Sequence, residues 1–379
     1  MQFMHLFKGH RKFVKSEAPQ ESTSLDKMAW RRLRSNKLAM TSLVVIGLFI
    51  LIAILGYLIT PDHTPYCNQQ YLELATQKPF SKATFLCIDN LPESQKQQPN
   101  IVKRMVNGTP LPYTAIPIYG YKEVGDSIIA ETFTGSVPND GERIAVAKSE
   151  VAKIQTRTFI FGTDSYGRDV LSQILIGSRV SLSVGFIAIA IALLIGITLG
   201  ALAAYYGGWV DNLIVWFINV VWSIPTVLLV IAITFALGKG FWQVFIAVGL
   251  TMWVDIARVV RGQVFSLKEK EYIEATRALG FSTFRTIFHH ILPNITGAII
   301  VVATSNFASA ILLEAGLSFL GIGVQPPMVS WGSMVKENYG YILLDSAHLA
   351  FIPGIAIMII VLAFMLLGNG IRDALDIKK

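Results

Sequence analysis

Few residues of this chain have the types and spacing that catalysis or metal binding requires. His289 and His290 are adjacent, so on a helix their side chains point about 100° apart, and no other histidine or cysteine lies near them in the sequence. The sequence has no Gly-x-x-x-x-Gly-Lys-Ser/Thr motif, the loop that holds nucleotide phosphates. No nucleophile stands beside a base. We therefore predict no metal site, no bound cofactor and no catalytic residue in this chain.

The most distinctive polar stretch is residues 268–294, a charged segment between two strongly apolar runs. Its pattern predicts two short helices that meet at Gly280, a residue suited to ending the first helix in the left-handed conformation. The second helix carries one apolar stripe at i, i+3, i+4 and i+7: Phe284, Ile287, Phe288 and Ile291. Pro293 is expected to stop this helix, and Asn294 to start the next one. By shape alone, a simple connector between two membrane spans fits this stretch equally well.

Glu314 is the acidic residue that lies deepest in an apolar run. An ionised carboxylate that faces lipid costs about 2.5–3.5 kcal/mol on insertion scales, so we expect this side chain to face other helices or to lie at the end of its span. Gly316 and Gly321, just after it, favour the position at the end. Ser318 and Thr304 are candidate polar neighbours. A helix-fixing hydrogen bond is the expected role, and direct contact with a substrate is the alternative.

The composition indicates a membrane protein. Of the 379 residues, 53% are hydrophobic and 15% are charged, and the mean hydropathy is +0.53. Uncharged runs predict six transmembrane helices, and the fourth run is short and is expected to continue through Val260. The runs are 38–60, 180–210, 212–238, 240–254, 295–320 and 349–369. We therefore predict an all-α polytopic membrane protein with six transmembrane helices.

Basic residues predict the orientation. Residues 1–37 hold nine Lys or Arg against three acids and no apolar core, which indicates a cytoplasmic basic leader and not a cleavable signal peptide. A nucleic-acid role is the weaker reading because a span follows at once. The charged segment after the fourth span holds six basic residues, whereas the two short loops on the other side hold one lysine each. Both termini and residues 268–294 are therefore predicted to be cytoplasmic.

Residues 61–178 are then predicted to form an extracytoplasmic α/β or β-rich insertion between helices 1 and 2. Strand-like runs occur at 113–121, 127–133 and 143–151. Cys67 and Cys87, the two cysteines of the chain, both lie in this region, which favours a disulfide over two free thiols. Near its end, Asp164 or Ser165 is expected to cap a helix that lies along the membrane surface. The remaining residues, 179–379, are predicted to form a five-helix core.

Two features of this core concern helix packing. Gly196 and Gly200 form a small-residue stripe that allows close helix approach. Pro225 lies inside the third predicted span and is expected to kink it. The kink is a candidate for shaping a pathway, with static geometry as the alternative.

The charged segment also resembles a known loop. Glu274-Ala275-Thr276, Gly280 and Ile291-Leu292-Pro293 resemble the "EAA" loop of the ABC-importer permeases, with Thr276 in place of the usual second alanine. Residues 162–171 (GTDSYGRDVL) resemble the "GTDxxGRD" segment of the peptide and nickel branch of that family, as do residues 314–332 and 366–376. The resemblance covers the first span and residues 161–379. Residues 61–160 fall outside it.

This resemblance implies the C-type transmembrane subunit of an ATP-binding-cassette importer in the bacterial cytoplasmic (inner) membrane, for di- or oligopeptides. It implies three kinds of partner: a second permease subunit, two cytoplasmic ATPase subunits that bind ATP and magnesium, and an extracytoplasmic substrate-binding protein. The loop would dock on an ATPase and transmit its movement. The expected coupling residues are Glu274, Ala275, Thr276, Gly280, Ile291, Leu292 and Pro293. The pathway or packing candidates are Glu314, Pro225, Gly196 and Gly200.

Three alternatives stay open at this point. One is an ABC importer for nickel or another small solute. Another is an ion-gradient-driven secondary transporter or channel, which only Glu314 and Asp255 support as intramembrane charges. The third is a membrane-anchored receptor, which would not need six spans.

Overall fold

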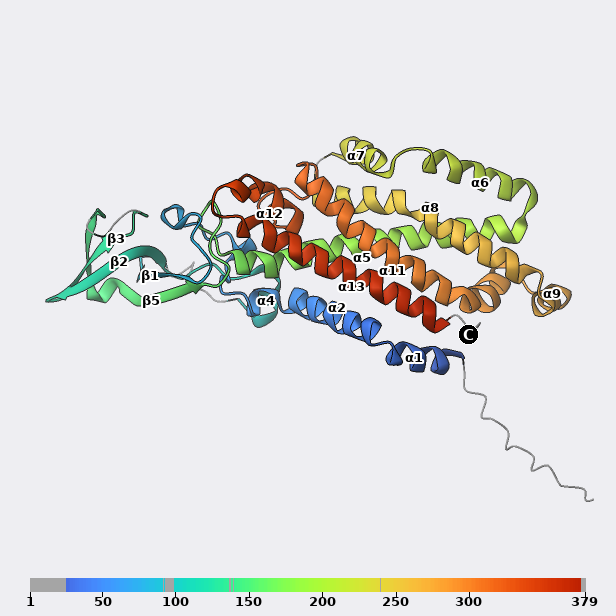
Figure 1. The fold of residues 1–379 in the computed structure, drawn as a ribbon, viewed down its shortest axis with the longest axis horizontal. Helices are drawn as coiled ribbons and strands as arrows, with labels where there is room; N and C mark the ends of the chain where they lie inside the picture. The colour runs from blue at the N-terminus through green and yellow to red at the C-terminus, as the bar shows by residue number, and fades with distance from the viewer. Residues whose placement is uncertain are drawn as a thin grey trace, which may run out of the picture.

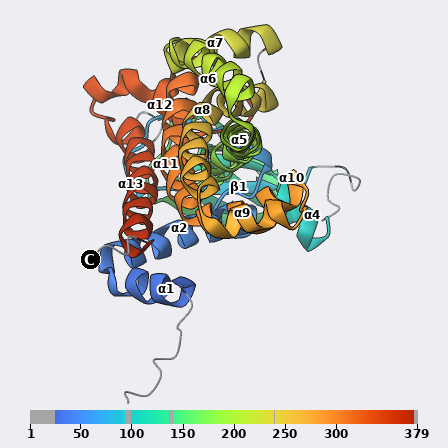
Figure 2. The ribbon, with the colours of Figure 1, turned by 90° about the vertical axis from the view of Figure 1, so that its right-hand side faces the viewer.

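The computed structural model describes residues 25–90, 92, 99–135, 138, 140–238 and 240–375. Most of the predicted leader, residues 1–24, lies outside the described residues, as do residues 376–379 of the tail. The described chain is elongated, with a bundle of long helices that carries a small β-sheet at one end (Figure 1). Helix α9 (Glu271–Ala278) lies at the opposite end. Viewed from that end, the short helix α1 (Leu25–Ser35) lies below the end of α13 (His348–Leu375) (Figure 2).

Five helices of the described residues are long and apolar enough to cross a membrane. They are α2 (Lys37–Leu55), α5 (Val170–Tyr206), α8 (Phe241–Lys268), α11 (Leu292–Phe319) and α13 (His348–Leu375). A bent pair, α6 (Gly208–Trp222) and α7 (Thr226–Leu237), gives a sixth span if the pair is counted as one. The chain is therefore a mostly helical polytopic membrane protein with five or six candidate spans.

The third predicted span is broken and not merely kinked. The axes of α6 and α7 lie 91° apart, and Pro225 stands at the N-cap of α7. Proline has no backbone N–H and disfavours helical geometry in the residue before it, so α6 ends at Trp222 and a new helix begins at Thr226. The proline was identified correctly, but its effect is larger than the predicted kink.

The small-residue stripe packs α5 against α8, as predicted. A Cβ atom added at Gly196 would lie 2.7 Å from the Ile256 side chain, and one added at Gly200 would lie 2.5 Å from the Ala257 carbonyl oxygen. Neither approach leaves room for a side chain. These glycines therefore let the two central helices touch along their backbones, and their role is packing.

The sheet has five antiparallel strands in the order β4-β3-β2-β1-β5. Their bounds are β1 (Ser81–Ile88), β2 (Thr114–Val124), β3 (Ser127–Thr132), β4 (Arg143–Ala147) and β5 (Val151–Phe159). The three predicted strand runs correspond to β2, β3 and β4, whereas β1 and β5 were missed. Strand β1 buries Phe85, Leu86 and Cys87 in succession, which hides the alternation of a half-exposed strand. Strand β5 carries polar residues along an edge of the sheet.

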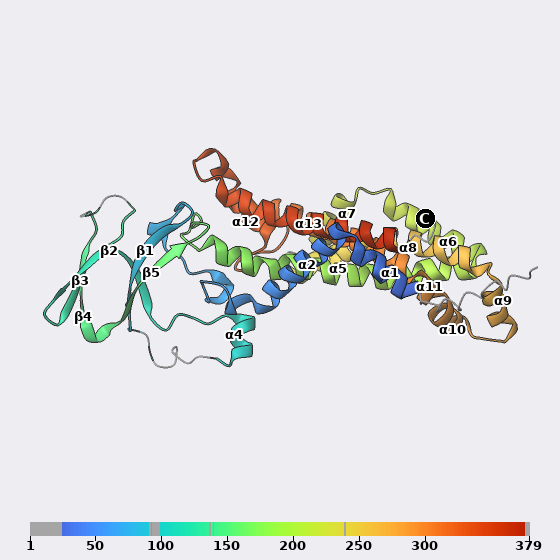
Figure 3. The same ribbon diagram turned by 60° about the horizontal axis from the view of Figure 1, so that its bottom comes forward.

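One arginine fastens the sheet region to the bundle. On α5, Arg179 donates from Nε to the Ala53 carbonyl oxygen at 2.5 Å and from Nη2 to the Met105 carbonyl oxygen at 2.6 Å. These carbonyls belong to the last turns of α2 and of α4 (Ile101–Asn107). A cation is stabilising at the negative end of a helix dipole, and here it serves two helices at once. Figure 3 shows α4 beside the junction of the sheet with the bundle.

The predicted disulfide is wrong, because Cys67 and Cys87 are both free and buried. Cys67 packs with Tyr57 and Ile176 at the end of the bundle, and its thiol donates to the Asp62 carbonyl oxygen at 3.2 Å. Cys87 lies on β1 in a separate apolar cluster with Phe85. Burial raises the pKa of both thiols, so each stays protonated in its own packed environment.

The predicted surface helix before the second span is also wrong. Asp169, and not Asp164 or Ser165, is the N-cap, and its side chain accepts from the Ser172 backbone N–H at 2.9 Å. From Val170 a single helix of 37 residues runs through to Tyr206. Because the cap stands four or five residues later than expected, Asp164 does not cap this helix and is free to make other contacts.

Candidate functional site

The charged segment forms a compact turn at the end of α9. The Phe281 N–H donates to the Thr276 carbonyl oxygen at 3.0 Å, and the Gly280 N–H donates to the Arg277 carbonyl oxygen at 2.9 Å. These two bonds define a Schellman motif, which places its left-handed residue at Gly280. Gly280 has φ +73°, as the sequence predicted, and no atom lies within 4 Å of the place a Cβ would take. The turn is thus set by local backbone bonding.

Helix α9 has an anchored face and an open face. Ile273 is fully buried and Thr276 is 5% exposed, whereas Glu274 and Ala275 are exposed. The Thr276 hydroxyl donates to the Ile273 carbonyl oxygen at 2.7 Å. The two buried residues hold the helix on the bundle, and the two exposed ones point outward.

Two basic residues contact the end of α5: Lys268 from the last turn of α8 and Arg277 from α9. Lys268 Nζ donates to the Ala204 carbonyl oxygen at 3.2 Å. The Arg277 guanidinium lies 5.1 Å from the centroid of the Tyr205 ring, within range of a cation–π contact. A displacement of α9 is therefore felt directly at the last turn of α5.

The predicted apolar stripe after the turn divides between two faces. Ile287 and Ile291 are 4% and 0% exposed and join the core, whereas Phe284 and Phe288 are 66% and 49% exposed. The two phenylalanine rings stack with their centroids 4.3 Å apart. An exposed aromatic pair beside α9 is unusual for a simple connector and typical of a docking surface.

The expected helix stop at Pro293 is wrong, because the chain stays helical through it. The short helix α10 (Thr283–Arg285) leads into a π-helical turn, η5 (Thr286–Ile291), and then into α11. Proline is tolerated in the first turn of a helix, and the π turn changes the hydrogen-bond register just before it. Asn294 does not start a helix; its side chain donates to the His290 carbonyl oxygen at 2.7 Å. Pro293 also borders an open groove of about 1260 Å³ between α1, α11 and α13.

Glu314 is fully buried, in a network of hydroxyl groups at the sheet end of α11. Ser318 on its own helix donates to Glu314 Oε1 at 2.7 Å, and Ser181 of α5 donates to Glu314 Oε2 at 3.2 Å. The Ser330 hydroxyl in turn donates to Ser318 Oγ at 3.3 Å, at the start of α12 (Trp331–Asn338). Ser318 was a predicted neighbour; Thr304 instead donates to its own helix. The carboxylate thus joins three helices.

A second buried network was missed by sequence reasoning. Asp164 accepts from Arg168 Nε at 2.6 Å and from Gln173 Nε2 at 2.9 Å. Arg168 also donates from Nη2 to Glu337 of α12 at 2.7 Å. Burial lowers the pKa of Arg168, but the carboxylates of Asp164 and Glu337 outweigh it and leave that pKa raised. The Asp164–Arg168 spacing of four residues was the signal that could have indicated this ion pair.

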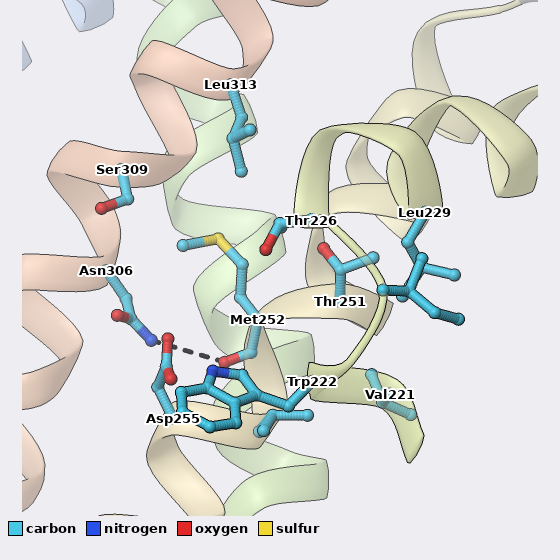
Figure 4. A pocket seen from close by; sticks show the side chains of 12 residues that line it. Val221, Trp222, Thr226, Leu229, Thr251, Met252, Asp255, Asn306, Ser309 and Leu313 are labelled. Carbon is cyan, nitrogen blue, oxygen red and sulfur yellow. Dashed lines mark hydrogen bonds between the residues drawn. The ribbon is translucent and has the colours of Figure 1, made fainter. Parts of the chain in front are cut away.

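The break between α6 and α7 lies against α8 and α11 and leaves a cavity of about 270 Å³. The side chains that line it include Trp222, Thr226, Thr251, Asp255, Asn306 and Ser309 (Figure 4). Asn306 donates from Nδ2 to the Met252 carbonyl oxygen at 3.4 Å. Polar groups around a cavity at membrane depth are typical of a passage for a polar solute.

The predicted site residues therefore lie in several separate parts of the structure and do not form one site. The predicted coupling residues lie around α9 and the start of α11, and Glu314 lies toward the other end of α11. Pro225 stands at the cavity break, while Gly196 and Gly200 lie between α5 and α8. Among the described residues, no three or more His, Cys, Asp or Glu side chains are grouped to hold a metal ion.

Two family profiles match the chain. Residues 196–378 match the binding-protein-dependent transport system inner membrane component, and residues 24–79 match the N-terminal TM domain of oligopeptide transport permease C. In the solved structures, the inward-facing MetNI methionine ABC transporter aligns with a TM-score of 0.45 at 19% identity, over 54% of this chain and 97% of that chain.

Curated relatives extend the match. The dipeptide transport system permease protein DppC of Alkalihalophilus pseudofirmus is 45% identical over 218 residues, 58% of this chain and 71% of the relative. The glutathione transport system permease protein GsiD of Pectobacterium atrosepticum is 42% identical over 57% of this chain and 72% of its own length. The oligopeptide transport system permease protein OppC of Bacillus subtilis is 39% identical over 58% and 71%. The chain therefore belongs to the binding-protein-dependent inner membrane permeases, the membrane-spanning subunits of ATP-binding-cassette importers.

Proposed function

We propose that this chain is the C-type permease subunit of an ATP-driven importer for di- or oligopeptides. The names of the relatives support this substrate class, because they are dipeptide, oligopeptide and glutathione permeases at about 40–45% identity. Glutathione is itself a peptide, so one solute class covers all three. The chain forms part of the path and hydrolyses no ATP itself.

The orientation follows from the two ends of the molecule. Helices α9 and α1 and the last turns of α13 lie toward one end, and the sheet lies at the other (Figure 1). The basic residues of α1 and of 268–294 favour the cytoplasm for the first end. Residues 61–169, before α5 begins, are then extracytoplasmic, residues 1–37 are a cytoplasmic leader, 38–60 are the first span, and the core follows.

The open face of α9 is the observation that carries the proposed mechanism. Glu274, Ala275 and the exposed Phe284–Phe288 pair form a surface for a cytoplasmic ATPase, while Ile273 and Thr276 fix that surface to the bundle. Movement of the ATPase then reaches α5 through Arg277 and reaches α11 through the unbroken helix after the turn. Such a surface shifts the permease between states only if its contacts differ in the two states.

The partners follow from this arrangement. A second permease subunit would complete the path, and the cavity at the α6–α7 break faces outward from this chain, where such a subunit would pack. Two cytoplasmic ATPase subunits hold ATP and magnesium, and a substrate-binding protein delivers peptide at the sheet end.

Reconstituted transport tests the proposal. The complete complex, placed in liposomes with its binding protein, is expected to take up radiolabelled dipeptide when ATP and magnesium are supplied on the ATPase side. A nonhydrolysable ATP analogue or an imposed proton gradient is expected to give no uptake. Uptake of nickel instead of peptide would replace the substrate class, and gradient-driven uptake without ATP would reject the mechanism.

A further inference from the structure

The cavity at the α6–α7 break contains a carboxylate without a partner. Three of its other polar side chains are engaged: the Thr251 hydroxyl donates to the Val248 carbonyl oxygen at 2.8 Å, the Ser309 hydroxyl donates to the Ser305 carbonyl oxygen at 3.3 Å, and the Asn306 amide donates to Met252. For Asp255, which is exposed on α8, no hydrogen bond or ion pair joins it to any described residue. Figure 4 shows its carboxylate directed to the side of the cavity where Asn306 lies.

The nearest cation on the same helix face is already held elsewhere. Arg258, one turn along α8, donates from Nη2 to Asn219 Oδ1 at 3.2 Å, and its guanidinium lies 3.7 Å from the centroid of the Trp222 ring. These two contacts hold its guanidinium against α6, and no ion pair joins it to Asp255 in the described part of the chain.

Two other acids of the described spanning helices are satisfied within the chain, and a third, Asp373, is exposed in the last turn of α13 and does not line the cavity. Asp211 accepts two bonds from Arg261, each of 2.6 Å, and Glu314 accepts from two serine hydroxyls. An acid inside a membrane protein is costly unless it pairs with a cation or lines a water-filled cavity. Asp255 therefore differs from Asp211 and Glu314 in having its negative charge available to a mobile ligand at the cavity.

We propose that Asp255 binds the N-terminal ammonium group of a peptide during its passage, an inference that rests on the proposed function. An ammonium group matches a single carboxylate in charge and in hydrogen-bond donors. Asp255 is the only acid that lines the cavity within the described chain, which is too few ligands for a tightly held metal ion. Trp222, Met252 and Leu313 offer apolar contacts to a peptide side chain beside it. One charged contact also suits a passage, where a ligand must leave as readily as it enters.

A cysteine at the cavity wall reports on occupancy without relying on the binding protein. Because Cys67 and Cys87 are buried, Ser309→Cys introduces the accessible thiol of this chain. In the complete permease–ATPase complex, a tripeptide with a free amino terminus is expected to slow maleimide labelling of that cysteine. The N-acetylated form of the same tripeptide is expected to need at least about tenfold higher concentration for the same protection, as loss of a charge-assisted hydrogen bond predicts.

The Asp255 variants decide the assignment. Adding Asp255→Asn to Ser309→Cys is expected to raise the half-protecting concentration of the free tripeptide about tenfold, to that of the acetylated form, and Asp255→Glu is expected to restore the difference. Asp126→Asn, the same change in the exposed β2–β3 turn, is the matched control and leaves protection unchanged. Three results would overturn the proposal: equal protection by both tripeptides, no protection by either, or protection that Asp255→Asn does not change. ATP-driven uptake by the same preparation is measured separately. Absence of uptake rejects the proposed function. Uptake without Asp255-dependent protection rejects only this binding site.

Discussion

The hydroxyl oxygens of Thr276 and Thr286 lie 3.3 Å apart across the turn that follows α9. Both side chains are buried, so this contact joins the inner face of α9 to the π-helical start of the α11 helix. Thr276 stands where the family loop usually has a second alanine. A small buried residue at this place lets α9 lie close to the helix that it is proposed to move.

Gly280→Val tests the turn. A β-branched side chain at φ +73° adds strain of about 1–2 kcal/mol, although there is open space around it. We expect an assembled complex that keeps ATPase activity and loses peptide uptake. Gly262→Val is the control, since Gly262 lies in α8 with open space around it and without a positive φ. Normal uptake by an assembled Gly280→Val complex would contradict the role of the turn.

Substitutions at Glu314 test whether its charge or its hydrogen bonds matter. Glu314→Gln keeps a side chain of the same shape that still bonds Ser181 or Ser318, so we expect assembly and uptake close to normal. Glu314→Ala removes the acceptor to which both serine hydroxyls donate, which costs about 1–3 kcal/mol for each buried donor, and is expected to lower the melting temperature of the complex clearly. Lost uptake in a fully assembled Glu314→Gln complex would instead place this carboxylate on the peptide path.

Two ion pairs near the sheet differ in burial, so we expect them to differ in their contribution to stability. Removing Arg168, whose side chain is 9% exposed, leaves Asp164 buried without its cation and is expected to cost about 3–5 kcal/mol. Lys78→Ala breaks a pair with Asp345 whose side chains are 72% and 86% exposed, and is expected to leave the stability almost unchanged, because water and salt screen an exposed pair. Thermal unfolding of Arg168→Ala and Lys78→Ala in detergent compares them. Equal shifts in melting temperature would show that the Arg168 network is not structural.

Alkylation of the two cysteines tests whether they are free and buried. Because burial raises the pKa of both thiols, each is protonated and covered in the folded state, and we expect little alkylation until the protein is unfolded. The stability that these protonated thiols provide is present below the ordinary thiol pKa of about 8.5 and is lost as the pH rises above it. Mass spectrometry without reductant should recover both peptides unlinked. A Cys67–Cys87 linked pair would contradict the structure.

Local signals in the sequence predicted the parts that depend on local bonding. Gly280 was assigned its left-handed conformation because a helix end is a local feature, and Gly196 with Gly200 marked a close helix contact. The helix stop at Pro293 was wrong because a π-helical turn, which no residue pattern indicated, absorbs the proline.

Contacts between segments far apart in the chain could not be predicted from the sequence. Ser181 and Ser330 complete the Glu314 network from two other helices. Arg168 donates to Glu337, which lies 169 residues further along the chain. The sequence identified Asp255 as an intramembrane charge, but only the break at Pro225 shows that it borders a cavity.

Protection of α9 by the ATPase subunits tests the central claim most directly. Ala275→Cys places a thiol on the exposed face of α9, in a chain whose own cysteines are buried. Maleimide labelling of this cysteine is expected to be fast in the permease pair alone and at least about tenfold slower once the ATPase subunits are bound, since docking covers α9. Asp126→Cys, exposed at the sheet end, should be labelled equally fast in both preparations. Equal labelling of Ala275→Cys with and without the ATPase subunits would contradict the account.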